Sequence, residues 1–117
     1  MNIKKAISLL ESLAQENRLK AFRILVKAGL DGLAAGEISK KMNTPQNTIS
    51  FHLSHLEKSG LIKSKKQSRY IIYSADFVMV EKLMKFLLEH CCFDSKNKCH
   101  IATNFIHLFK GNKNEKC

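Results

Sequence analysis

The cysteines of this 117-residue chain gather near its C-terminus, as Cys91, Cys92, Cys99 and Cys117, and the first 90 residues contain none. A disulfide framework would spread its cysteines across the fold, so this clustering indicates a thiol site instead. Buried cysteines are often inert small hydrophobes. Three of them within nine residues of an otherwise cysteine-free body favour a site. Cys117 is interpreted as incidental or as a spare ligand.

Three kinds of chemistry are open to such a cluster. Soft thiolates bind soft ions better than imidazole or carboxylate groups do, and His90 and His100 could complete a Cys/His site for zinc or cadmium. Cys91 or Cys92 could instead form a disulfide with Cys99 as a redox switch. No His-to-Cys arrangement or phosphate-binding loop supports a nucleophilic cysteine, so we expect the protein not to be an enzyme.

The charge of the chain points to an anionic partner. Lysine and arginine outnumber aspartate and glutamate by 20 to 10, which gives a formal charge of +10. Such an excess favours nucleic acid or an acidic membrane surface, although a merely soluble basic protein is the alternative. The sequence contains no run of 18 apolar residues, so no transmembrane helix is expected. Glu11 and the polar stretch 15–17 interrupt the apolar N-terminus too early for a signal peptide. We therefore expect a cytoplasmic protein without a membrane partner.

The elements that must position these groups follow from periodicity and from capping residues. Apolar spacing predicts helices over 3–14, 18–28, 34–42, 45–58 and 76–90. Asn17 and Thr44 are interpreted as N-caps, Pro45 as a first helical residue, and Gly29 and Gly60 as stops. Residues 31–33 read as a turn, and strands over 61–65 and 70–74 flank a basic tip at 66–69. The fold class is mainly α with a small β-hairpin, a winged helix-turn-helix in the order α-α-α-α-β-β-α. Residues 1–92 form its domain, and 93–117 form an extension whose end is expected to be disordered.

The helix over 45–58 has two faces, one for the core and one for DNA. Ile49, Leu53 and Leu56 share the inward face at 100° per residue. The opposite face is small and polar, which suits the major groove, and Asn47 could contact a base through two hydrogen bonds. Phe51 could contact a thymine methyl group or pack against a neighbouring element. The predicted DNA-binding residues on this helix are Gln46, Asn47, Thr48, Ser50, Phe51, Ser54 and His55.

The hairpin adds Lys63, Lys65, Lys66 and Arg69, which could lie along phosphates or enter the minor groove. A solvated charged turn is the alternative for these residues, and a DNA-binding architectural protein without a sensor is the alternative for the whole chain. His52 and His55 are expected to be structural or to face DNA rather than to bind metal.

These motifs together resemble the ArsR/SmtB family of bacterial metal and metalloid sensors over residues 5–92. The resemblance implies a homodimeric repressor of operator DNA that dimerises through its first and last helices and is released by its ligand. The apolar stripes Ile3, Ile7, Leu10 and Phe77, Val80, Met84, Leu87 agree with that interface. The matching segments are Leu13-Ala14-Gln15-Glu16-Asn17-Arg18-Leu19, Gly36-Glu37-Ile38-Ser39, Asn47-Thr48-Ile49-Ser50-Phe51-His52-Leu53, Leu56-Glu57-Lys58-Ser59-Gly60-Leu61-Ile62 and Ser68-Arg69-Tyr70-Ile71-Ile72-Tyr73.

The chain departs from two ligand sites of that family. Ala34-Ala35-Gly36 stands where one arsenic site has Cys-x-Cys, and Asp76-Phe77-Val78 stands where the zinc site begins Asp-x-His. Ser68 replaces the usual glycine of the hairpin.

What remains is the cysteine set Cys91, Cys92 and Cys99, which resembles the branch that binds trivalent arsenic. Three thiolates would satisfy As(III) or Sb(III), and organic arsenicals need only two. No resident cofactor is expected. Two adjacent cysteines in a regular helix point about 100° apart. Ligand capture should therefore distort the end of the last helix and change the separation of the two reading helices, which DNA requires at a fixed spacing.

Overall fold

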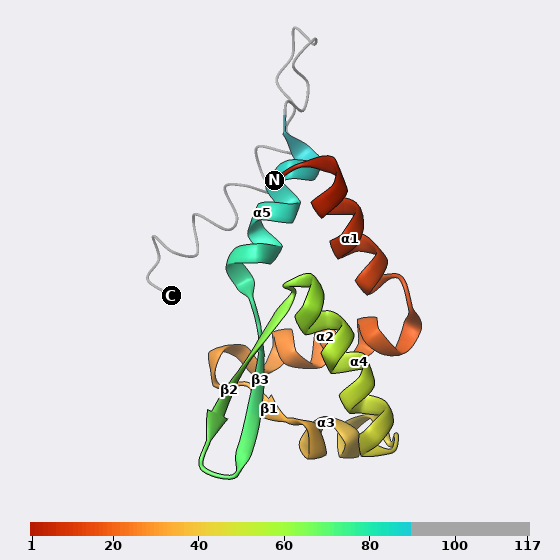
Figure 1. The fold of residues 1–117 in the computed structure, drawn as a ribbon, viewed down its shortest axis with the longest axis vertical. Coiled ribbons are helices and arrows are strands. Elements are labelled where there is room, and N and C mark those ends of the chain that lie inside the picture. Colours follow the sequence, from red (N-terminus) through yellow and green to blue (C-terminus); the bar gives the residue numbers. More distant parts are fainter. Residues whose placement is uncertain (90–117) are drawn as a thin grey trace, which may run out of the picture. The chain divides into compact units, whose positions relative to one another are not determined.

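A computed structural model describes residues 1–89, and the predicted fold class is confirmed there (Figure 1). The compact unit Met1–Leu83 holds most elements, and α5 continues into a second unit that begins at Met84. The predicted boundary at residue 92 lies outside the described residues. The elements are α1 (Ile3–Leu13), α2 (Glu16–Ala28), the short 3-10 helix η1 (Gly29–Asp31), β1 (Leu33–Ala34), α3 (Ala35–Met42), α4 (Gln46–Ser59), β2 (Ile62–Gln67), β3 (Tyr70–Ala75) and α5 (Phe77–Leu88).

Side-chain caps begin the first two helices. Asn2 Oδ1 accepts a hydrogen bond from Lys5 N at 2.8 Å and starts α1. The prediction of Asn17 as the cap of the second helix was wrong, because Gln15 Oε1 accepts from Arg18 N at 2.8 Å and α2 begins at Glu16. A long amide side chain reaches the same free N–H groups that a shorter one would. Gly29 ends α2 with a φ of 76°, as predicted.

The tight turn between α3 and α4 is built differently from the predicted cap. Asn43 takes the left-handed conformation with a φ of 51°, which asparagine tolerates better than most residues. Thr44 does not cap α4, since its Oγ1 donates to Met42 O at 3.0 Å instead. Pro45, predicted as the first helical residue, occupies the cap position, and α4 starts at Gln46. A proline disfavours the helical conformation in the residue before it, so α4 does not extend back to Thr44.

The small sheet has three antiparallel strands in the order β1-β3-β2. β2 and β3 pair from Ile62↔Ala75 to Gln67↔Tyr70, which leaves Ser68 and Arg69 as the turn. The third strand, β1, was predicted as part of a turn and a helix. It pairs with β3 at Leu33↔Tyr73.

The core of the compact unit lies where the helices meet the base of the sheet. Its fully enclosed side chains include Leu25, Ile38, Ile49, Leu53, Leu56 and Leu61. Helical spacing predicts one apolar face of α2 with Leu19, Phe22, Leu25 and Val26. Phe22 and Leu25 are buried, but Leu19 and Val26 remain 42% and 40% exposed. The stripe Ile3, Ile7 and Leu10 of α1 is also exposed, while Ala6, Leu9 and Ser12 are buried.

Candidate nucleic-acid interface

The helix α4 is anchored by one face and leaves the other free. Ile49, Leu53 and Leu56 are 0% exposed and hold it in the core, as predicted. The exposed face carries most of the residues predicted to bind DNA. These are Gln46, Asn47, Ser50, Phe51, Ser54 and His55, with Lys58 beyond them, and Thr48 is half-buried. The face therefore presents amide, hydroxyl, imidazole and aromatic groups in a row.

Two residues of this face have informative surroundings. Phe51 is 66% exposed, which favours contact with a base over packing against a neighbouring element, the two alternatives left open for it. Asn47 Oδ1 accepts a hydrogen bond from Thr48 N at 2.9 Å. A bidentate contact of Asn47 with a base would therefore have to share or release that local bond, whereas its amide N–H groups remain available.

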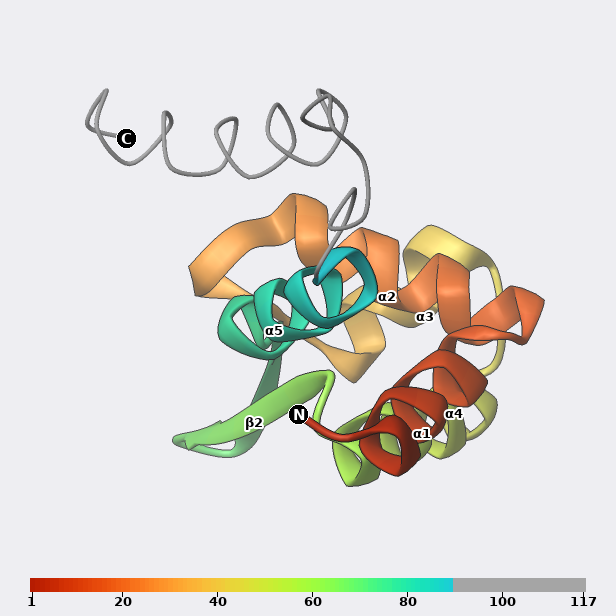
Figure 2. The same ribbon diagram turned by 90° about the horizontal axis from the view of Figure 1, so that it is seen from above.

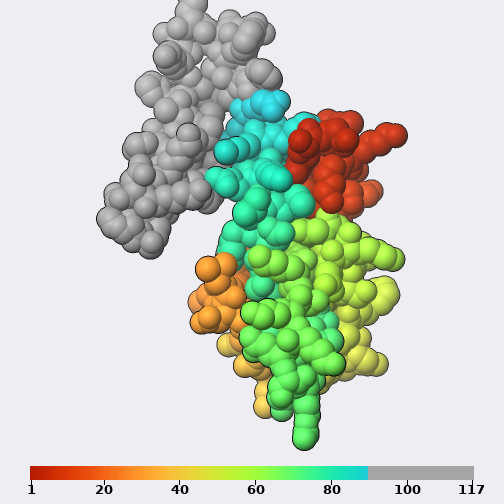
Figure 3. Space-filling view, turned by 60° about the vertical axis from the view of Figure 1, so that its left-hand side comes forward, coloured from red at the N-terminus to blue at the C-terminus, as the bar shows by residue number. Residues whose placement is uncertain are grey.

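The hairpin of β2 and β3 forms the wing, a narrow finger beyond the helices (Figure 3). Its predicted cations are all exposed, and they are Lys63, Lys65, Lys66 and Arg69. Ser68 has a φ of 59° at the turn, a conformation that a glycine would adopt more easily, so the substitution keeps the turn at some cost. Ser64 Oγ donates to Glu57 Oε2 at 2.6 Å and ties the wing to α4. The carboxylate of Glu57 is therefore engaged by a hydroxyl group of the wing.

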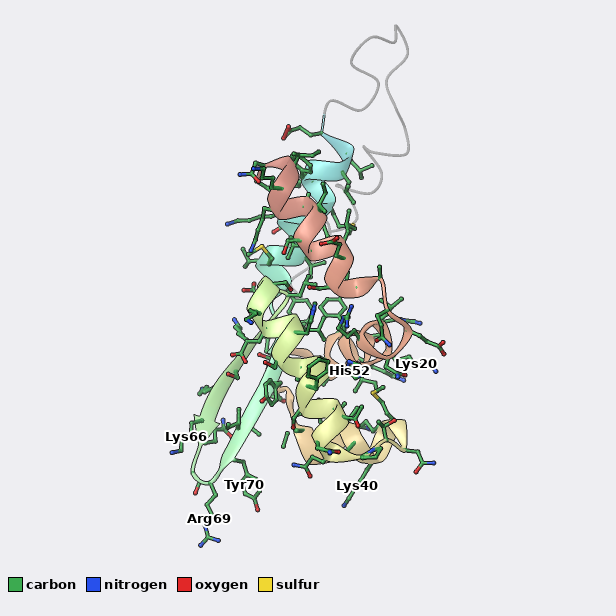
Figure 4. The ribbon with its side chains drawn as sticks, turned by 45° about the vertical axis from the view of Figure 1, so that its right-hand side comes forward. Lys20, Lys40, His52, Lys66, Arg69 and Tyr70 are labelled. Carbon is green, nitrogen blue, oxygen red and sulfur yellow. The ribbon has the colours of Figure 1, made fainter. Side chains whose placement is uncertain are left out.

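A cleft of about 490 Å³ lies between the wing, α3 and the first half of α4. Gln46 and Ser50 line it from α4, and Arg69 and Tyr70 line it from the wing. Lys40 lines it from α3 and, like Tyr70, was not among the predicted site residues. Figure 4 shows Lys40, Arg69 and Tyr70 at the same end of the molecule. The two adjacent lysines Lys40 and Lys41 are visible in the sequence as a local positive charge. The place of Lys40 beside the wing could not be predicted, because no periodic pattern relates α3 to the wing.

A buried histidine lies directly behind the exposed face of α4. His52 is 7% exposed, and within residues 1–89 its Nδ1 has no hydrogen-bond partner. Burial lowers the pKa of His52, and the positive charges of Arg18 and His55 lower it further. The ring of Phe51 meets His52 edge to face with centroids 6.0 Å apart. His52 is thus a neutral structural residue, one of the two roles predicted for it.

A second titratable group is perturbed at the base of the cleft. Burial raises the pKa of Tyr73, and the nearby carboxylate of Glu57 raises it further. Tyr73 is one of the residues that line the cleft, and a protonated phenol can donate a hydrogen bond.

The predicted thiol site, Cys91, Cys92 and Cys99, lies outside the described residues, as do His90, His100 and Cys117. Within residues 1–89, no three His, Cys, Asp or Glu side chains are placed to hold a metal ion. The same part of the chain contains no helix with the length and apolar character needed to cross a membrane.

Comparisons with known proteins agree with this interface. Residues 13–65 match the family described as a helix-turn-helix domain, a segment that contains α2, α3, α4 and the beginning of β2. The transcriptional activator HlyU of Vibrio cholerae is 29% identical over 91 residues, which are 78% of this chain and 82% of HlyU. A structure of reduced HlyU from that organism is 30% identical, covering 76% of this chain and 90% of HlyU with a TM-score of 0.59.

Two further structures extend the likeness. The transcriptional repressor PagR of Bacillus anthracis is 29% identical, with 73% of this chain and 94% of PagR covered and a TM-score of 0.61. An ArsR-like transcriptional regulator from Rhodococcus shares the fold at 21% identity, with 97% of this chain and 93% of the regulator covered and a TM-score of 0.65. The chain therefore belongs to the helix-turn-helix transcriptional regulators of the HlyU type, and it shares the winged-helix fold of an ArsR-like regulator.

Proposed function

We propose that this regulator is a homodimeric repressor that binds a two-half-site operator and leaves it when a thiol-reactive ligand binds Cys91, Cys92 and Cys99. The observation that carries the DNA-binding part is the exposed polar face of α4 beside the cationic wing. A helix with such a face can enter the major groove while wing cations contact phosphates.

An unpartnered face of α1 supports the dimer. Ile3, Ile7 and Leu10 recur at helical spacing and are 63%, 49% and 40% exposed. Phe77 and Leu87 of α5 are exposed as well. Burying such apolar surface against a second copy would be favourable, and a symmetric pair would present two reading helices to two half-sites.

The ligand proposed is trivalent arsenic, with antimonite and organic arsenicals as related inducers. Support comes from the donor set, because three thiolates match the valence and softness of As(III) and no other cysteine lies in residues 1–90. Binding would draw the three sulfurs together just after α5. The chain segment that follows the apolar stripe of α5 would then be repositioned, and the dimer with it.

A second candidate is a redox-responsive regulator with the same DNA-binding face. One similar structure is described as reduced HlyU, and that description names a redox state of that protein. Oxidation of Cys91 or Cys92 with Cys99 would form a disulfide and release two electrons to an oxidant such as a peroxide. A third candidate is a regulator that responds to zinc or cadmium, bound by the same cysteines together with His90 or His100.

The direction of regulation is part of the proposal, because HlyU is described as an activator and PagR as a repressor. The direction of regulation is measured by a transcription assay on a promoter that carries the preferred duplex, which is selected as described below. Repression predicts less transcript with the protein and recovery with arsenite, whereas a rise in transcript would contradict this part.

The binding test begins with selection of a preferred duplex from a randomised pool. Affinity for that duplex is then measured with arsenite, antimonite, zinc, cadmium and peroxide, each added to the reduced protein. Cys91→Ser, Cys92→Ser and Cys99→Ser should each abolish release by arsenite, while the matched control Cys117→Ser should retain it. Release by arsenite in all three variants would refute the site, and release by peroxide alone would establish the redox reading instead.

A further inference from the structure

The C-terminal end of α4 is partly closed by hydrogen bonds from the residues that follow it. Gly60, with a φ of 98°, donates its N–H to Glu57 O at 3.0 Å, and Leu61 N donates to Leu56 O at 3.1 Å. This is the Schellman pattern, which satisfies carbonyls of the last helical turn. The carbonyl of Ser59, the last residue of α4, faces a different donor.

That donor is an ammonium group from α1. Lys5 Nζ lies 2.8 Å from Ser59 O in a partly buried contact between residues 54 positions apart in the chain. A Cβ added to Gly60 would lie 3.4 Å from the same Nζ, so the ammonium sits directly against the helix end. A cation is favourable there because the carbonyls at a helix C-terminus carry partial negative charge. α1 and α4 are in contact within the compact unit, and α1 overlies α4 in the view from above (Figure 2).

The other end of α1 is fastened to α2. Arg18 Nε donates to Ser12 O at 2.7 Å, and Arg18 Nη2 lies 3.4 Å from Glu11 O. Ala6 and Leu9, which lie between Lys5 and Glu11 in the sequence of α1, are almost fully buried. α1 is therefore fixed by polar contacts near both of its ends. Its apolar stripe remains exposed, and Lys5 binds the end of α4.

We propose that Lys5 is a positioning residue for DNA recognition, which sets the angle between α1 and α4. The proposal rests on the dimer proposed above, in which α1 forms part of the interface. In that dimer, the angle at Lys5 determines how far apart and in what orientation the two α4 helices lie. Lys5 thereby favours one spacing of half-sites over others, without touching DNA itself.

The test compares whole-operator with half-site binding. Lys5→Met keeps most of the length of the side chain and removes its charge, Lys5→Gln removes the charge and is too short to reach Ser59 O in the same way, and Lys5→Arg keeps the positive charge. Lys4→Met is the matched control, because Lys4 is an exposed neighbour that carries the same charge. Affinities are measured for the selected duplex, for a duplex with one half-site, and for duplexes with one base pair added or removed between half-sites.

We expect Lys5→Met to weaken binding to the selected duplex by roughly 5- to 10-fold, the lower part of the usual range of coupling between sites. The affinity of Lys5→Met for the single half-site should change no more than that of Lys4→Met. The loss of affinity caused by adding or removing one base pair between half-sites should become smaller in Lys5→Met. Lys5→Arg should restore the affinity for the selected duplex and its dependence on spacing. Lys5→Gln should behave like Lys5→Met, which keeps the comparison available if the latter unfolds. Equal losses in Lys5→Met and Lys4→Met, or an equal loss on the half-site, would overturn the proposal.

Sedimentation of the unmodified protein separates the two proposals. A monomer would contradict the proposed dimer, whereas a dimer in which Lys5→Met binds like the unmodified protein would contradict only the role of Lys5.

Discussion

The wing makes a quantitative prediction about salt. Arg69 lies in the two-residue turn at the tip and lines the cleft with Gln46 and Ser50. A guanidinium in that place can bind a phosphate through two hydrogen bonds. Each phosphate contact contributes about 0.9 to the slope of log affinity against log salt concentration. Because the proposed dimer has two wings, Arg69→Gln should reduce the magnitude of that slope by about 1.8.

The size of the effect makes it measurable. Between roughly 50 and 200 mM salt, a slope difference of 1.8 corresponds to about a 12-fold smaller loss of affinity in Arg69→Gln than in the unmodified protein. Fluorescence anisotropy with the selected duplex gives both slopes. Lys20→Gln is the matched control, because Lys20 lies on α2 and pairs with Glu16 at 3.0 Å. Parallel salt dependences for Arg69→Gln and the unmodified protein would show that the tip does not contact phosphate.

Two further predictions concern folding. Because burial lowers the pKa of His52, the folded state binds fewer protons than the unfolded state, and stability should be lost as pH falls below about 6.5. Urea unfolding at several pH values should show this loss removed in His52→Gln and only slightly reduced in His55→Gln, because the charge of His55 is the smallest of the three causes. An equal loss in both variants would contradict it. Gly32→Ala should cost more stability than Gly29→Ala, although both glycines have positive φ, because a Cβ on Gly32 would lie 2.2 Å from Tyr73 O while one on Gly29 meets nothing within 4 Å. Equal shifts in thermal unfolding would contradict the steric reasoning.

Regular periodicity explains most of what could be predicted. The inward face of α4 was predicted from Ile49, Leu53 and Leu56, and all three are fully buried. A helix repeats every 3.6 residues, so its apolar side can be read directly from spacing. The wing followed from two short strands around a polar tip, and its cations are exposed as expected. These features are local, and local sequence encodes them.

Features that depend on distant partners were missed or assigned wrongly. β1 has only two residues and exists because it pairs with β3, about 40 positions away. In α1, the polar Ser12 is buried, because the neighbouring elements decide which side of the helix is covered. In α2, Leu19 and Val26 had the right type for the core but not the right neighbours.

The interface divides in the same way. The types and spacing of residues on α4 and in the wing were enough to predict a DNA-binding face, because each lies within one element. The cleft that joins Lys40 to Arg69 and the contact of Lys5 with Ser59 exist only in the folded chain. Each joins elements whose residues lie far apart in sequence, and their approach is set by burial of the core between them rather than by any local pattern.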